Sequence, residues 1–172
     1  MTHSDSSFPE LHPADGPWSI YLHVSFCLYR FLYCDFNTYV LSAMGNVAVA
    51  GYLKAVHREL ELAADVLGAG QPPVSTIFFG GGTPTMLSPV QLGELVDHIR
   101  TLWGTDLNAE ITTEANPETL SGEVLAGLLK AGINRLSMGM QSADEFVLTV
   151  LDRRHRPGRA GGLDQLARRL GF

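Results

Sequence analysis

The sequence predicts an α/β fold: a parallel sheet of about four strands with helices outside it. Three observations lead to this prediction. Strand-like and helix-like segments alternate, the connections between most of them are short, and 45% of the 172 residues are apolar. Parallel neighbours need a crossover connection, usually a helix, so this alternation indicates repeated β-α units. Because such crossovers are right-handed, two architectures remain: an open doubly wound sheet, or an arc of a (β/α) barrel.

Four segments have the composition of strands, because they are rich in β-branched and aromatic residues or alternate in polarity. They are residues 18–24, 75–79, 109–114 and 135–140. A long loop through both cysteines, to about residue 45, is expected after the first strand.

Helices are predicted after each strand, with ends marked by capping residues. The segment 49–67 repeats apolar residues at helical spacing, and Gly68 suits its C-terminal cap. Ser88 followed by Pro89 predicts the start of a second helix, since serine caps and proline fits the first turn. Ser121 predicts the start of a third helix in the same way.

Two further helices complete the predicted pattern. Ser142 and Glu145 are spaced as a capping box and predict that a fourth helix begins there. A short fifth helix is expected over residues 160–170, in an arginine-rich end that we interpret as a solvated face.

The composition excludes several classes of protein. With a formal net charge of −6 and 17% charged residues, the chain is neither a disordered polyelectrolyte nor a globally basic nucleic-acid binder. No apolar run approaches the roughly 20 residues of a transmembrane helix. Residues 1–17 are polar and lack the pattern of a signal peptide, so they are predicted to be a disordered leader. We therefore expect one cytoplasmic domain over residues 18–172.

Unusual residues follow the predicted strands, and ligands in parallel α/β folds bind at the carboxyl ends of strands. They are Cys27 and Cys34 after the first, Gly80, Gly81, Gly82 and Thr83 after the second, Glu114 and Asn116 after the third, and Gln141 after the fourth. Four strand ends with such features together are more informative than any one alone.

Each of these residues also has a purely structural interpretation. The glycines could present backbone N–H groups to a ligand or form a tight turn, and they match neither a Walker loop nor GxGxxG. Glu114 could accept ribose hydroxyls or an ammonium group, or could be a solvated carboxylate. Gln141 could contact a ligand or start a helix, and Arg153, placed on the following helix, could reach a carboxylate or lie in water. Two thiolates alone are too few for a zinc or iron–sulfur site.

Taken in order, the motifs resemble the radical S-adenosylmethionine (radical SAM) family, in its branch of haem chaperones (HemW) and oxygen-independent coproporphyrinogen III oxidases. The matching stretches cover residues from about 18 to 160. They are IYLHVSFCLYRFLYCDFNTY, STIFFGGGTPTML, EITTEANPETL, GINRLSMGMQSAD and LDRRHRPGRA. The segment CDFN is more similar to the chaperone group than to the oxidases, which usually have a further cysteine there.

The resemblance implies a partial (β/α)6 barrel that binds a [4Fe–4S] cluster, S-adenosylmethionine and haem or a porphyrin. In the family, a CxxxCxxC motif holds the cluster, and Cys27 and Cys34 match its first and third cysteines. Further positions match the family's cofactor contacts. Tyr21 and Tyr33 match residues beside the cofactor, and Gly81, Gly82 and Thr83 match the loop that receives the methionine amino group. Glu114, Gln141 and Arg153 match contacts to the ribose and methionine ends.

The sequence departs from the family pattern at the cluster loop. Phe31 stands where the middle cysteine is expected, and Ser25 and Leu32 stand where proline is usual. Because a phenyl ring has no electron pair to offer iron, we expect poor cluster assembly and no radical chemistry. The chain is also expected to lack the fifth and sixth strands and the C-terminal region, which would leave an open sheet edge prone to self-association.

The sequence therefore supports a HemW-like radical SAM haem chaperone. Its function is expected to be impaired by Phe31 in the cluster loop and by the absence of the fifth and sixth strands. The alternatives are an oxygen-independent coproporphyrinogen III oxidase in porphyrin biosynthesis, or an inactive remnant that still binds S-adenosylmethionine. A decayed product without stable function is a further alternative. A cluster-free, aldolase-like or phosphate-binding barrel fragment is permitted by the glycine triplet, but it predicts neither the cysteine loop nor the order of the motifs.

Overall fold

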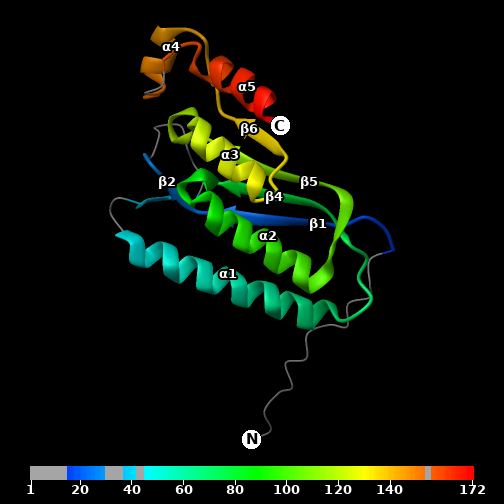
Figure 1. The fold of residues 1–172 in the computed structure, drawn as a ribbon. Helices are drawn as coiled ribbons and strands as arrows, with labels where there is room; N and C mark the ends of the chain where they lie inside the picture. The colour runs from blue at the N-terminus through cyan, green and yellow to red at the C-terminus, as the bar shows by residue number, and fades with distance from the viewer. Residues whose placement is uncertain (1–14, 30–36, 42–44, 154–155) are drawn as a thin grey trace, which may run out of the picture.

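The computed structural model describes residues 15–29, 37–41, 45–153 and 156–172. A four-stranded sheet contains β1 (Ser19–Val24), β4 (Val74–Gly81), β5 (Thr105–Ala115) and β6 (Arg135–Met138), and a two-residue ladder joins β2 (Phe26–Cys27) to β3 (Tyr39–Val40). The helices are α1 (Gly45–Leu67), α2 (Pro89–Trp103), α3 (Gly122–Lys130), α4 (Glu145–Val150) and α5 (Arg159–Leu170), with short 3₁₀ turns η2 (Pro84–Met86) and η3 (Pro117–Thr119). Figure 1 shows the arrangement.

The sheet decides between the two predicted architectures. All four strands are parallel and stand in the order β1-β4-β5-β6, so each crossover leads to the next strand along. A doubly wound sheet reverses its strand order part-way and has helices on both faces. Here α1, α2 and α3 lie side by side over one face (Figure 1). The structure thus confirms an α/β fold with four parallel strands and outer helices, arranged as an arc of a barrel.

The two faces of the sheet differ in burial. Leu22, Val24, Ile77, Phe79 and Ile111 are buried against the helices. Alternate residues point to the other face, and there the strands carry mainly aromatic and polar side chains. We call this second face the open face. The hydrophobic core therefore lies between the sheet and the helices, and the open face is available to a ligand-binding site.

The register of the strands places the open-face residues in rows. Tyr21 pairs with Phe78, which pairs with Thr112, and the rings of Tyr21 and Phe78 stack with centroids 6.0 Å apart. His23 pairs with Gly80 one step nearer the carboxyl ends. Tyr21 is 57% exposed and Thr112 is fully buried, so the row is accessible from the open face at its Tyr21 end.

Helix ends agree with most of the predicted caps. Ser88 caps α2 and exchanges hydrogen bonds with Gln91 in a capping box. Ser121 accepts a hydrogen bond from the Val124 N–H at the start of α3. Gly68, after α1, has φ +69°, the left-handed conformation that glycine adopts readily.

The predicted start of the fourth helix is wrong by two residues. Asp144 is the N-cap of α4, because its Oδ1 accepts the Val147 N–H at 3.1 Å. Ser142 instead accepts the N–H of Asp144 at 3.0 Å. Serine and aspartate both cap helices well, so spacing alone selected the wrong one. The sequence predicted Arg153 on the helix after the fourth strand. In the structure Arg153 follows α4 and lies outside any helix.

The predicted loop after β1 contains a short ladder. The N–H of Tyr39 donates to the carbonyl of Ser25 at 2.7 Å, which brings β3 beside β2 and places Cys27 close to the end of β1. The predicted leader lies largely outside the described residues, so its disorder stays a prediction. Within the described ranges, no helix is both long and apolar enough to cross a bilayer.

Candidate functional site

The glycine triplet begins within the last two residues of β4 and ends at Gly82, which packs directly on the chain between β1 and β2. A Cβ atom on Gly82 would lie 2.5 Å from the carbonyl oxygen of Phe26 and 2.9 Å from that of Val24. Gly81 has φ +106°, and a Cβ there would meet the ring of His23 at 2.6 Å. Glycine is therefore required at Gly82 by the close approach of backbone atoms, and at Gly81 by the left-handed backbone conformation.

The N–H groups of this loop are engaged within the protein. The Gly82 N–H donates to the carbonyl of Val24 at 2.8 Å, and the Thr83 N–H to that of Phe26 at 2.7 Å. The Gly81 N–H donates to Oε2 of Glu114 at 3.1 Å. The interpretation that these N–H groups face a ligand is thus wrong, because two carbonyls of β1 and β2 and the Glu114 carboxylate accept their hydrogen bonds. Receipt of an amino group at Gly81, Gly82 and Thr83 would need carbonyl oxygens, and it stays a prediction.

Glu114 is the acidic residue of the site. It lies near the end of β5, half-buried, with one carboxylate oxygen fixed by Gly81. Partial burial, and then the nearby charge of Glu114, raise the pKa of Tyr21 above its usual value. The structure thus brings together a phenol, a carboxylate and the glycine loop, as the sequence predicted.

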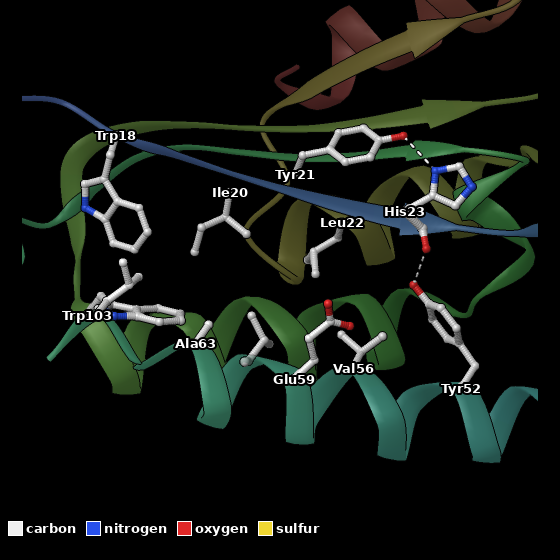
Figure 2. A pocket seen from close by; sticks show the side chains of 12 residues that line it. Trp18, Ile20, Tyr21, Leu22, His23, Tyr52, Val56, Glu59, Ala63 and Trp103 are labelled. Carbon is white, nitrogen blue, oxygen red and sulfur yellow. Dashed lines mark hydrogen bonds between the residues drawn. The ribbon is translucent and has the colours of Figure 1, made fainter. Parts of the chain in front are cut away.

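His23 and Tyr52 belong to the same site, although no residue pattern singled them out. The Tyr21 hydroxyl is hydrogen-bonded to Nδ1 of His23 at 3.0 Å, and the Tyr52 hydroxyl donates to the His23 carbonyl at 2.8 Å (Figure 2). Tyr52 reaches β1 from α1, 29 residues along the chain, so the sequence carried no signal for this contact. The contact anchors α1 to the strand that bears the site.

A pH-dependent stabilisation by Tyr52 follows from its surroundings. Burial, and then the charges of Glu59 and Tyr21, raise the pKa of Tyr52 from 10.0 to about 12. The unfolded chain therefore ionises this phenol at lower pH than the folded chain does, and the stabilisation is complete below pH 10 and lost as pH rises towards 12. We expect Tyr52→Phe to lower the thermal midpoint below pH 10, by a margin that shrinks between pH 10 and 12.

Thermal melts of both proteins at pH 8, 10 and 11.5 would measure this margin. The comparison with Tyr52→Phe cancels the titration of the other groups in the chain. A margin that stays constant over this range would contradict the assigned environment of Tyr52.

Cys27 lies beside the glycine loop. It is 5% exposed, and its sulfur accepts a hydrogen bond from Thr83 Oγ1 at 3.7 Å. Cys34, the other predicted cluster ligand, lies outside the described residues, as do Tyr33, predicted beside the cofactor, and Phe31. Among the described residues, no three histidine, cysteine or acidic side chains are grouped so that they could hold a metal ion.

Gln141 and Arg153 meet near Gly139, beyond the end of β6. Gln141 is exposed and has φ +62°. A Cβ atom on Gly139 would lie 2.9 Å from Nε2 of Gln141 and 3.8 Å from Nη2 of Arg153. The Gly139 N–H is 3.3 Å from the carbonyl of Ala115, one residue past Glu114. The two predicted residues therefore lie together at the neighbouring strand end.

Comparison with known proteins identifies the family. The profile of the radical SAM superfamily matches residues 21–170, which include most of β1 and every site residue described above. This chain belongs to the radical SAM superfamily. The glycine loop, Glu114 and Cys27 are therefore parts of a radical SAM domain.

Similar proteins place the chain in a branch of that family. It is 46% identical to the heme chaperone HemW of Mycobacterium tuberculosis over 165 residues, which are 95% of this chain and 42% of that protein. It is 41% identical to HemW of Bacillus subtilis over 155 residues, or 90% of this chain and 40% of that protein. Coproporphyrinogen III oxidase (HemN) from Escherichia coli, described as a radical SAM enzyme, superposes with a TM-score of 0.81 at 33% identity, over 91% of this chain and 35% of that one. The chain thus spans about two-fifths of the two HemW proteins and about a third of HemN.

Radical SAM domains in general hold S-adenosylmethionine and a [4Fe–4S] cluster, and the residues present fit the two groups differently. Glu114, fixed at a strand end beside Tyr21, offers a carboxylate suited to hydroxyl or ammonium groups. The thiolate donors do not fit the cluster, because the sequence has two cysteines where the family motif has three. We therefore derive no chemistry through a cluster.

Proposed function

We propose that this chain is the radical SAM domain of a haem-chaperone-like protein, that it binds S-adenosylmethionine, and that Phe31 impairs its cluster. The likeness to two HemW proteins at 46% and 41% identity supports the chaperone branch over the oxidase. The names of these relatives support haem or a porphyrin as the further ligand, and we propose the cytoplasm as the compartment.

One observation carries the proposed cofactor binding: the Glu114 carboxylate is fixed at the meeting point of β4, β5 and the glycine loop. Its Oε2 accepts the Gly81 N–H, and the face beside it is lined by the rings of Tyr21 and His23. A fixed carboxylate beside aromatic rings suits a ligand with ribose hydroxyls and a cationic amino group. Such a charge-assisted hydrogen bond is about twice as strong as a neutral one.

Self-association through the β6 side of the sheet is a further part of the proposal. The described residues place no strand beyond β6, and apolar side chains on α4 are exposed, with Phe146 at 76% and Val150 at 61%. An open strand edge with apolar neighbours favours pairing with another chain.

Calorimetric titration of the iron-free protein with S-adenosylmethionine tests the proposed ligand. We expect saturable binding, and Glu114→Gln should weaken it at least tenfold, which corresponds to about 1.4 kcal/mol. Glu110→Gln is the matched control, because Glu110 lies on the same strand and contacts Arg135 instead. Absence of binding, with or without iron, would remove the proposal, and equal losses in both variants would show that Glu114 has no special role.

A further inference from the structure

A groove runs along the outer side of β1, between this strand and α1. Its volume is about 320 Å³, within the range of small-molecule sites. Figure 2 shows its lining side chains, from Trp18 at one end to Tyr52 and His23 at the other. The groove lies at the edge of the sheet, while the glycine loop and Glu114 lie at the carboxyl ends of β4 and β5.

One end of the groove is aromatic and rigid. The rings of Trp18 and Trp103 meet edge to face with centroids 5.4 Å apart. Trp18 is held by its Nε1, which donates to the carbonyl of Pro72 at 2.6 Å. The floor is aliphatic, with Leu22, Val56 and Leu60 buried or nearly so. These walls suit an apolar body, aromatic or branched.

The other part of the groove carries acceptors. Glu59 extends from α1 towards β1 (Figure 2), and it is the acidic residue among the described residues of the lining. Its charge contributes to the raised pKa of Tyr52, which places the carboxylate near that hydroxyl. No basic side chain is found among the described lining residues, apart from the imidazole of His23. The groove therefore favours a cation over an anion.

The edge of β1 adds backbone acceptors. The carbonyls of Trp18 and Val24 point towards β4, since they accept the N–H groups of Ser75 and Gly82. Alternate carbonyls along a strand point to opposite sides, so those of Tyr21 and His23 point to the outer edge. The Tyr52 hydroxyl already bonds to the His23 carbonyl. The carbonyl of Tyr21 is thus aimed at the groove, in which Tyr21 is a lining residue.

We propose that this groove binds a small organic cation: a protonated primary amine on an aromatic or branched aliphatic body. The body packs on Trp18, the floor and Trp103, while the ammonium group pairs with Glu59 and donates to the Tyr21 carbonyl. This inference does not depend on binding of S-adenosylmethionine, because none of its contacts involves Glu114 or the glycine loop.

The chain provides its own reporter for the test. Its two tryptophans both line the groove, so tryptophan emission excited at 295 nm reports on occupancy of the groove. The probe is phenethylamine, and its neutral counterpart is 2-phenylethanol. We expect a saturable emission change with phenethylamine and at least fivefold weaker binding of the alcohol.

Three variants make the test specific. Glu59→Gln should weaken phenethylamine at least fivefold and leave the alcohol unchanged. Ala63→Phe, which fills the groove from α1, should abolish both signals. Glu61→Gln is the control, because Glu61 is on the same helix but lies 4.0 Å from Nε2 of His98, away from the groove. Circular dichroism melts confirm that each variant is folded.

Each outcome of these titrations supports or overturns the proposed amine site. No saturable change up to millimolar phenethylamine would overturn the proposed site, and so would equal binding of amine and alcohol. Binding that survives Ala63→Phe in a folded protein would place the amine elsewhere. Binding of phenethylamine together with failure of S-adenosylmethionine to bind would leave the groove assigned and overturn only the proposed function.

Discussion

Phe31→Cys protein, reconstituted anaerobically with iron and sulfide, is expected to bind about four irons per chain, and the unchanged protein well below that. The substitution restores the third cysteine of the family motif, beside Cys27 and Cys34. Iron is held by thiolates, and a phenyl ring contributes no electron pair. The change of one residue should therefore convert a chain without a stable cluster into one that has it. Iron analysis and the visible charge-transfer absorption measure the difference.

The matched control is Phe31→Ser, which removes the ring and supplies a group of similar size to cysteine without a thiolate. It is expected to stay low in iron. A full complement of iron in the unchanged protein would show that Phe31 does not disable the site. Equal gains in the serine and cysteine variants would show that the bulk of the ring, and not the missing ligand, prevents assembly.

The elements of this fold were predictable because local chemistry marks their ends. Ser88 and Ser121 cap helices in the structure as expected, and Gly68 adopts the left-handed conformation expected of a glycine cap. The order of strands was not predictable from these signals, since a doubly wound sheet and a barrel arc use the same β-α units. The ladder between β2 and β3 was also missed, because two residues carry no periodicity.

The site was predictable as a set of residues but not as a set of contacts. Tyr21, Glu114 and the glycine loop do lie together, because parallel strands bring their carboxyl ends to one edge. The partners of the loop N–H groups depend on how β1 continues into β2, which composition does not encode. Arg159 shows the same limit: expected in water, it donates to the carbonyls of Pro117 and Leu120 and ties α5 to η3.

Gly82→Ala is expected to lower the thermal midpoint by roughly 10 °C, the largest loss of stability we predict for a single methyl group. The new Cβ would lie 2.5 Å from the Phe26 oxygen and 2.9 Å from the Val24 oxygen. Both are backbone oxygens that accept hydrogen bonds from this loop. Neither can move away without breaking the hydrogen bonds that hold the end of β4 to β1 and β2. Overpacking of this kind costs about 3 kcal/mol, and each kcal/mol shifts the midpoint of a chain this size by about 2–4 °C.

Gly51→Ala is the matched control, because Gly51 lies within α1 and a Cβ there meets nothing within 4 Å. It should raise stability slightly, since alanine favours a helix by about 1 kcal/mol over glycine. In a Cys34→Ser background, Gly82→Ala should also speed labelling of Cys27, which is buried against Thr83 in the native loop. Melting and labelling like those of the unchanged protein would contradict the close approach of the glycine loop to β1 and β2, and with it the position of Cys27 in the site.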